Sequence, residues 1–225
     1  MQIFTYNDYL DYISNKKIKK LIQNQNKKVN TKESIEKSKQ EAKEKDMTEK
    51  IKENLDKNIE ELLEDEQEVS KIINDYFKIQ ICDINSKNLE KKQFKENKKS
   101  KIFKVKEKDI YFIIKLEKTP NYDIPYIIFN ECIELIKKLK EDYKEKKPVI
   151  IPIIIYIGNE KWNIQHNNRI RYTSFEENNM ELGYNILDFN LYKTKDIKSK
   201  KSKINKYILL KKEMKIYLID EKYNL

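Results

Sequence analysis

The apolar run VIIPIIIYIG, at residues 149–158, constrains the fold of this chain more than any other segment. A continuous apolar run of this length between polar flanks is typical of a strand that is covered on both faces, as in a parallel sheet. The run is too short to cross a membrane, and it contains Pro152. We expect Pro152 at the start of the strand, because proline cannot donate a hydrogen bond to a neighbouring strand.

The segments before this run predict the rest of the sheet. KIFKVKEKDIYFIIKLEK predicts a hairpin with strands at residues 102–106 and 110–117. Apolar residues at helical spacing follow over residues 128–143, with Asp123 suited to cap that helix and Pro125 in its first turn. A strand, a crossover helix and a second strand form a βαβ unit with parallel strands. We therefore expect an α/β fold, a small mixed sheet flanked by helices.

The N-terminal quarter of the chain differs from this core. Residues 1–14 are rich in aromatics and suit a short docking helix, and residues 15–50 are polar enough for a linker or a solvated helix. From residue 51 to 77 the apolar spacing is helical, with a junction between two helices at the acidic cluster EELLEDEQE. We therefore divide the chain into a charged arm, 1–50, and a domain, 51–225.

The C-terminal part gives weaker signals. After Trp162 the periodicity fades, and YNILDFNLY suits a strand or a turn. The polar stretch QHNNRIR, which contains His166, is interpreted as a surface loop. The last segment, INKYILLKKEMKIYLIDEKYNL, fits both helix and strand, and we favour a helix.

The charge of the chain is compatible with a polyanionic partner. Charged residues make up 38% of the sequence, and the net charge is +10 with a pI near 9.2. This balance suits nucleic acid. An AT-rich coding bias, which enriches Lys, Asn and Ile together, is the alternative explanation. The charge alone does not decide between them.

The residue types exclude several chemistries. With 2 glycines in the chain there is no Gly-rich phosphate loop, and neither a Walker A motif nor a dinucleotide fingerprint occurs. The single histidine, His166, rules out His-rich metal sites. Cys82 and Cys132 lie far apart, as expected of reduced thiols in a cytosolic protein. Because the N-terminus lacks an apolar signal segment, we expect a cytoplasmic protein without a membrane segment.

A series of motifs runs from the N-terminus to about residue 195. In order they are IFTYNDYLDYI, LDKNIEELLEDEQEVSKIINDYF, KSKIFKVKEKDIYFIIKLEKTPNYDIPYIIFNECIELI and PVIIPIIIYIGNEKW. The series resembles the YhgA-like family of recombination-promoting nucleases and transposases, within the PD-(D/E)XK nuclease superfamily, and PIIIYIGNEKW is its most specific part. Leu55 stands where the family usually has histidine, whereas Asp56 and Lys57 are kept. The resemblance implies a PD-(D/E)XK-like fold.

The resemblance also implies a magnesium site, from which this sequence departs. Family members hold Mg²⁺ with carboxylates at the end of a bent hairpin, and the metal activates water against a phosphate. The aspartate position of the family's SDL-type motif is Lys101 here. In its E-x-Q motif, the glutamate position is Lys115 and the glutamine position is Glu117. Each ammonium would repel a cation by roughly 4 kcal/mol per unit charge at ~4 Å. We therefore expect degenerate catalytic positions, no bound metal and no cofactor, with Mg²⁺ implied only if other carboxylates act as ligands.

Lysines in these positions suit a different role. We expect Lys101 and Lys115 to line a phosphate-sized cleft that binds nucleic acid without cutting it. Alternatively, Lys115 reaches solvent or pairs with Glu117 or Glu131. Arg169 and Arg171, the only arginines of the chain, are weaker candidates for phosphate binding, because guanidinium groups suit phosphate. The full predicted nucleic-acid-binding set is Lys101, Lys104, Lys115, Lys118, Arg169 and Arg171.

Three functions follow from these observations. The first is an inactivated member of the nuclease family that acts as a nucleic-acid-binding or regulatory pseudonuclease. The second is an active Mg²⁺-dependent DNA endonuclease whose ligands have migrated to other carboxylates. The third is a protein-interaction module, such as an inhibitor of a nucleic-acid machine. The lysines favour the first, hence a protein without enzymatic activity. The pattern does not distinguish DNA from RNA, identify a protein partner or indicate an oligomeric state.

Overall fold

The computed structural model describes residues 31–77, 84–93, 100–142, 148–164, 167–173 and 179–223. The predicted docking helix at residues 1–14, Cys82 and His166 lie outside these residues. The elements are α2 (Thr31–Leu62), α3 (Glu66–Tyr76), β1 (Leu89–Lys92), β2 (Lys101–Val105), β3 (Ile110–Glu117), α4 (Ile124–Asp142), β4 (Val149–Tyr156), β5 (Asn167–Thr173), β6 (Asn179–Asp188), the 3₁₀ helix η1 (Phe189–Leu191), α5 (Thr194–Lys198) and α6 (Ile204–Tyr223).

The chain divides into two compact units, Met1–Asn58 and Ile59–Leu225. In the first unit the described residues belong to α2, which continues into the second unit. Lys50 donates to Asp46, one turn earlier on this helix, at 2.7 Å. Residues 31–50, the described part of the stretch 15–50 for which a linker and a solvated helix were both open, are helical.

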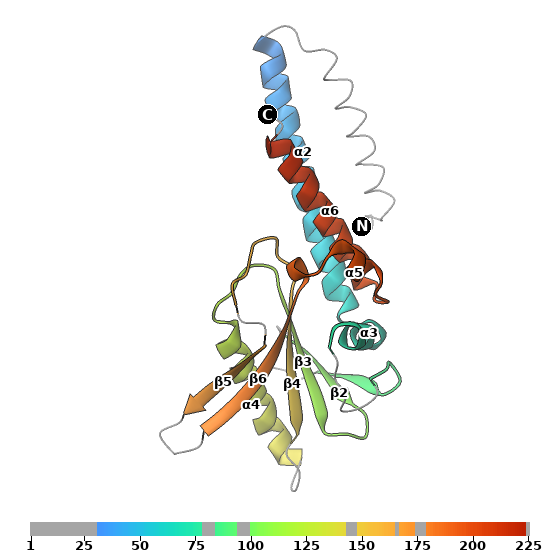
Figure 1. Ribbon diagram of the computed structural model, residues 1–225, viewed down its shortest axis with the longest axis vertical. Coiled ribbons are helices and arrows are strands. Elements are labelled where there is room, and N and C mark those ends of the chain that lie inside the picture. The colour runs from blue at the N-terminus through green and yellow to red at the C-terminus, as the bar shows by residue number, and fades with distance from the viewer. Residues whose placement is uncertain are drawn as a thin grey trace. The chain divides into compact units, whose positions relative to one another are not determined.

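The second unit is built around a six-stranded mixed sheet with the strand order β1-β2-β3-β4-β6-β5 (Figure 1). β1, β2 and β3 pair antiparallel, β4 pairs parallel with both β3 and β6, and β5 pairs antiparallel with β6. The helix α4 connects β3 to β4. The predicted α/β class, the hairpin and the βαβ unit are thus confirmed.

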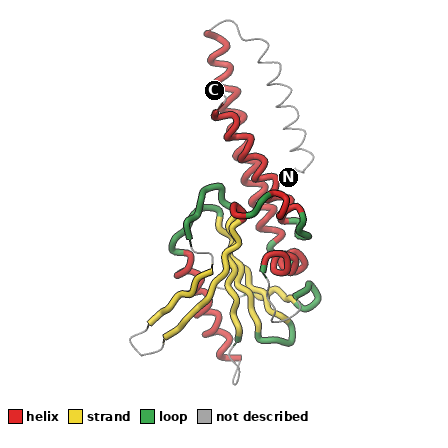
Figure 2. The backbone as a smooth tube through the Cα atoms, in the orientation of Figure 1, coloured by secondary structure: helices red, strands yellow, loops and turns green. Residues whose placement is uncertain are grey.

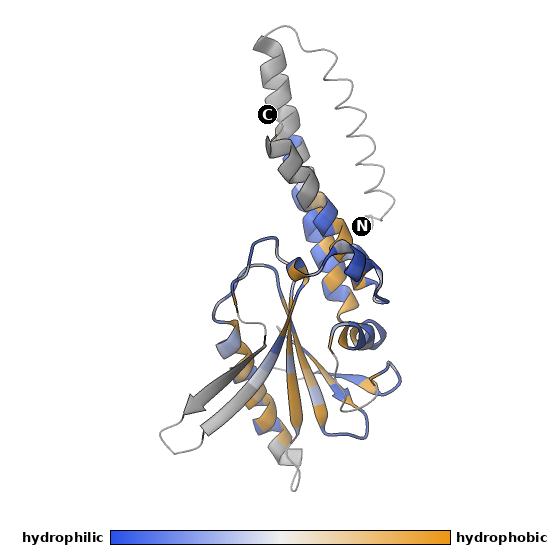
Figure 3. Ribbon diagram, in the orientation of Figure 1, coloured by the Kyte–Doolittle hydropathy of each residue, from blue (hydrophilic) through white to orange (hydrophobic). Residues whose placement is uncertain are grey.

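Two apolar cores cover the two faces of the sheet, and most apolar residues of the central strands lie in one or the other (Figure 3). On the face that we call the α4 face, α4 contributes its apolar stripe, Ile124, Ile128, Cys132, Leu135 and Leu139. On the opposite face, which we call the α3 face, the core includes Val69, Ile72, Ile73, Ile197, Ile204 and Ile208. Consecutive strand residues alternate between these faces. This alternation decides where each strand lysine points.

The turn between β2 and β3 shows why the hairpin was predictable. Lys108 N–H donates to the carbonyl of Val105 at 3.2 Å, which closes a tight turn. Glu107 adopts a φ of 61°, in the left-handed region. Polar residues in such a turn, between two apolar runs, are a local signal that is independent of the rest of the fold.

Two sequence-based expectations are wrong. Pro152 lies inside β4 and not at its start, opposite Ile113 of β3. It is tolerated there because β6 pairs with β4 only from Ile153 onward, so the ladder at Pro152 is one-sided. The stretch NNRIR is not a loop but part of the edge strand β5, whose polar sequence hides the period of two.

The C-terminal segment forms the helix α6, as favoured from its sequence. YNILDFNLY is a strand that ends in η1. Among the described helices, none combines the length and the apolar character that a bilayer-spanning helix needs. The loops that follow β3 and β4 leave the same edge of the sheet (Figure 2), which is the edge at the carboxyl ends of the parallel strands.

Gly158 is placed where the chain leaves β4, and it yields a direct test of the packing there. A Cβ at this position would overlap the hydroxyl of Tyr156 and the carbonyl oxygen of Lys118. The second of these is a backbone atom, so it cannot move aside as a side chain can. We expect Gly158→Ala to lower the free energy of unfolding by about 1–3 kcal/mol, as overpacking does. Urea unfolding followed by circular dichroism measures the change.

Gly183 provides the matched control for that variant. A Cβ there would meet nothing within 4 Å. We expect Gly183→Ala to be neutral or stabilising by up to about 1 kcal/mol, because glycine weakens a strand. Equal effects of the two substitutions would contradict the close packing at Gly158.

Candidate functional site

Lys115, the most unusual residue of β3, is buried against α4. Its exposed fraction is 4%, and strand alternation directs it to the α4 face together with Tyr111 and Ile113. Its ammonium nitrogen donates to Oε1 of Glu131 at 2.9 Å. Because α4 crosses this face after β3, Glu131 reaches the strand that precedes its own helix. Of the alternatives for Lys115, pairing with Glu131 is confirmed.

Ser100 completes a three-residue cluster. The hydroxyl of Ser100 donates to Oε2 of the same Glu131 carboxylate. The β2–β3 register pairs Lys101 with Ile114, so that one step further Ser100 stands opposite Lys115. Both oxygens of the carboxylate are therefore bonded, one to an ammonium and one to a hydroxyl. We call this arrangement the Ser100–Lys115–Glu131 cluster.

Lys101 does not join this cluster, which corrects the expectation of one cleft lined by both lysines. Lys101 lies opposite Ile114, whose side chain belongs to the core of the α3 face. It forms an ion pair there with Glu64. Lys101 and Lys115 thus lie on opposite faces of the sheet, because they are one register step out of phase.

The other predicted residues are also dispersed. Lys118 pairs with Glu60 at 2.7 Å. Lys104 lies 3.8 Å from a carboxylate oxygen of Asp109 and 5.6 Å from the centre of the Tyr111 ring. Arg169 and Arg171 lie on β5, at the far edge of the sheet. The structure does not bring the six residues together.

The residues of the cluster do not fit a divalent cation. The Lys115 ammonium already bonds the Glu131 carboxylate, and Glu117, two residues after Lys115, is the next acid on β3. Within the described part of the chain, no group of three or more His, Cys, Asp or Glu side chains is placed to hold a metal ion. By the β2–β3 register, Ser100 and not Lys101 is the residue opposite Lys115.

Cys132, next to Glu131 on α4, lies in the apolar core of the α4 face. Burial, and then the charge of the neighbouring Glu131, raises the pKa of the Cys132 thiol to about 12. The thiol is therefore protonated at neutral pH and is no nucleophile. In such surroundings an unpaired charge is costly, so Lys115 and Glu131 depend on each other.

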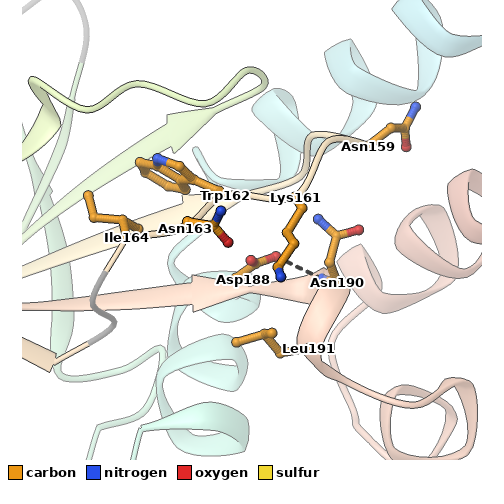
Figure 4. Close-up of a pocket in the computed structure, with 8 residues that line it drawn as sticks. All are labelled: Asn159, Lys161, Trp162, Asn163, Ile164, Asp188, Asn190 and Leu191. Carbon is orange, nitrogen blue, oxygen red and sulfur yellow. Dashed lines mark hydrogen bonds between the residues drawn. The ribbon is translucent and has the colours of Figure 1, made fainter.

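A cavity of about 400 Å³ opens beyond the carboxyl ends of β4 and β6 (Figure 4). Its one carboxylate, Asp188, is 3% exposed and accepts the N–H of Asn190 at 2.8 Å, which caps η1. The lining residues are Asn159, Lys161, Trp162, Asn163, Ile164, Asp188, Asn190 and Leu191.

The register places Glu117, Tyr156 and Asp188 in one row across β3, β4 and β6. The two carboxylates of this row are therefore two strand spacings apart, roughly 10 Å between backbones. Tyr156 stands between them and donates its hydroxyl to the carbonyl of Glu160 at 2.9 Å. Burial, and then the charges of Asp188 and Glu160, raise the pKa of the Tyr156 hydroxyl, so it remains neutral. This row does not assemble a pair of migrated metal ligands.

Comparison with known proteins gives one match. The model of the family described as "Putative transposase, YhgA-like" matches residues 53–219. No curated protein and no solved structure matches the chain. The matched region contains every element from the last turns of α2 to α6, including the Ser100–Lys115–Glu131 cluster.

Proposed function

Because the chain belongs to the YhgA-like transposase family, we propose that it is a nucleic-acid-binding member whose PD-(D/E)XK-type metal centre has been inactivated. The order of hairpin, α4 and β4 supports a PD-(D/E)XK-type core. The family supports nucleic acid as the class of partner. The lysine in the ligand position supports the loss of cleavage.

The observation that carries the proposal is the ion pair between Lys115 and Glu131. A nuclease of this type needs carboxylates that are free to bind Mg²⁺ at the end of the hairpin. Here the nearest carboxylate already neutralises an ammonium at 2.9 Å. A divalent ion beside that ammonium would be repelled by roughly 4 kcal/mol per unit of its charge at ~4 Å and an effective dielectric of about 20.

The electrostatics support binding in place of cleavage. The net charge of +10 attracts a polyanion over distances of about a Debye length, ~10 Å at moderate salt. Lysines neutralise phosphates as point charges, without reading bases. We therefore expect affinity with little sequence preference.

Two assays on the intact protein test this proposal. We expect fluorescence anisotropy with a labelled DNA duplex, and with a single-stranded RNA, to show binding that weakens steeply as salt rises. We expect supercoiled plasmid to remain uncut in the presence of Mg²⁺ or Mn²⁺. The control in the cleavage assay is Glu117→Ala, which removes the acid two residues after Lys115 on β3.

The possible outcomes separate the three candidate functions. Cleavage that disappears in Glu117→Ala would reveal a working metal centre, and cleavage that survives it would reveal migrated ligands. Either result overturns the loss of cleavage. No binding to either probe at low salt would overturn the nucleic-acid part and leave a protein partner as the remaining function.

A further inference from the structure

The strongest unneutralised positive charge of the described residues lies away from the hairpin. It occupies residues 193–206, which run through α5 into the first turn of α6, and we call this stretch the basic segment. Asp196 is its only acid. The stretch around α5 is among the most hydrophilic of the second unit (Figure 3). Its exposed lysines are Lys193, Lys195, Lys198, Lys201, Lys203 and Lys206.

Ion pairing distinguishes these lysines from those of the sheet. Three of the lysines predicted to bind phosphate, on the sheet or directly after β3, are neutralised by carboxylates: Lys101 by Glu64, Lys115 by Glu131 and Lys118 by Glu60. By contrast, no exposed lysine of the basic segment forms an ion pair with any residue that the structure describes. Affinity for nucleic acid comes from cations that displace counterions from phosphates. An ammonium already held by a carboxylate gains less from that exchange.

The backbone of the basic segment is held in place by two acids of α3, the buried Glu68 and the partly exposed Asp75. Oε2 of Glu68, which is fully buried, accepts the hydroxyl of Ser202 at 3.0 Å and the N–H of Lys203 at 2.6 Å. Oδ2 of Asp75 accepts the N–H of Lys201 at 2.9 Å. The carboxylates of α3 therefore bond backbone N–H groups of the segment and not the ammonium groups of its exposed lysines. The partly exposed Lys200 instead donates its ammonium to the carbonyl of Asp75 at 2.6 Å. Such an arrangement presents the charges at little cost in chain entropy.

An ordinary solvated surface has a different charge pattern. In α2, lysines alternate with glutamates along the sequence TKESIEKSKQEAKEKDMTEKIKENLDKNIEEL, as expected of a helix that is exposed to water. In the basic segment, the exposed lysines recur at spacings of two and three residues with one acid among them. Like charges at such spacing repel each other, so the cluster is favoured by a polyanion that lies across it.

We infer that the basic segment is the surface that binds the phosphate backbone of nucleic acid, with lysines of α5 and of the loop into α6 as the contacts. This inference rests on the proposed function and places it at a surface that is separate from the Ser100–Lys115–Glu131 cluster. The contacts are point charges to phosphate, so they set affinity and salt dependence but not sequence preference.

The test compares two triple variants that remove the same charge. One is Lys195→Gln, Lys198→Gln and Lys201→Gln in the basic segment. The matched control is Lys87→Gln, Lys108→Gln and Lys137→Gln, three exposed lysines from other parts of the second unit. The affinity of each full-length protein for a labelled DNA duplex and for a single-stranded RNA is measured by anisotropy over a range of KCl concentrations. Thermal unfolding by circular dichroism checks that both variants are folded.

Each lysine–phosphate contact contributes ~0.9 to the slope of log K against log salt for duplex DNA and ~0.7 for a single strand. Removing three contacts in the segment variant should therefore lower the magnitude of this slope by about 2.7 for duplex DNA and by about 2 for single-stranded RNA. At moderate salt this corresponds to at least tenfold weaker binding in the segment variant. The control variant should keep most of the slope. Equal losses in the two variants would overturn the inference but leave the proposed function standing. If the unmodified protein binds neither probe at low salt, both fall.

A second readout requires no substitution. Lysine acetylation by a water-soluble reagent, with and without bound nucleic acid, is quantified by mass spectrometry. We expect Lys195, Lys198 and Lys201 to be protected at least several-fold in the complex, whereas Lys87 and Lys137 react equally in both states. Protection confined to lysines outside residues 193–206 would overturn the assignment.

Discussion

Replacing Glu131 by alanine is expected to lower the free energy of unfolding by about 3–5 kcal/mol, because the substitution leaves a buried ammonium without its partner. Lys115 is 4% exposed and bonds Glu131 Oε1 at 2.9 Å. The same substitution also removes the acceptor of the Ser100 hydroxyl. An effect of this size is a large fraction of the stability of a typical domain. Urea unfolding at neutral pH, monitored by circular dichroism, measures it.

Two further variants make the result specific. Glu134→Ala removes an exposed acid from the same helix and should change stability by no more than about 0.5 kcal/mol. The double variant Lys115→Met with Glu131→Leu replaces the pair by apolar groups of similar size and should lie near the unmodified protein or above it. A loss below about 1 kcal/mol in Glu131→Ala would mean that Lys115 reaches water, and that the pair is not a buried one.

The double variant also has a functional consequence. If the Ser100–Lys115–Glu131 cluster is only structural, the apolar pair should bind nucleic acid with the affinity and salt slope of the unmodified protein. The proposal that the basic segment provides the contacts requires this outcome. A large loss of affinity in a stable double variant would assign a phosphate contact to Lys115, in agreement with its sequence-based prediction.

Local patterns were sufficient to predict the central part of the fold. The hairpin turn, the start of α4 at Ile124 and Pro125, and the apolar strand β4 each have a signal within a few residues of sequence. Their pairing follows from the rule that parallel strands need a crossover. β5 lacks such a signal, because it consists largely of polar residues whose strand conformation depends on pairing with β6, and YNILD at the end of β6 left strand and turn open.

Which side chains meet at the candidate site depends on the register between β2 and β3, and the sequence did not reveal that register. A shift of one residue moves a side chain to the other face of a sheet. The resemblance placed the aspartate position at Lys101, but Ser100 is the residue opposite Lys115. The placement of Lys115 and Glu117 at the two positions of one motif did not depend on that shift, because residues two apart on one strand lie on the same face.

The basic segment was missed for a different reason. Lysine is abundant throughout this sequence, so its local density carried little weight beside the motif positions. The structure distinguishes the two groups by their ion pairs. Lys101 and Lys118 are each neutralised by a glutamate, whereas the exposed lysines near α5 form no ion pair with the described residues. Such pairs join residues far apart in the chain, as Glu64 and Lys101 are, and a single sequence does not show them.

The acid sensitivity of the protein is expected to depend on Glu68, the fully buried carboxylate of α3. Burial alone raises the pKa of this carboxyl, but hydrogen bonds from Lys71, the Lys203 backbone and Ser202 outweigh burial and lower the pKa below its ordinary 4.5. Because the folded-state pKa lies below the unfolded value, the stabilisation is fully present above about pH 4.5 and is lost as the pH falls through the folded-state pKa.

We expect Glu68→Gln to lower the free energy of unfolding at neutral pH by about 1.5–3 kcal/mol, the range for hydrogen bonds to a charged group. The deficit should shrink as the pH falls below about 4.5, because the carboxyl of the unmodified protein then becomes protonated as well. Urea unfolding across the acid range measures both curves. Glu213→Gln, at an exposed acid of α6, is the control and should leave the curve unchanged. A deficit that stays constant with pH would show that the amide fails for steric reasons and not for lack of charge.

Glu68 also accepts hydrogen bonds from the Ser202 hydroxyl and the Lys203 backbone N–H, so it holds the basic segment in place. The same variant should therefore weaken nucleic-acid binding. Because the lysines of the segment remain, it should keep most of the salt slope.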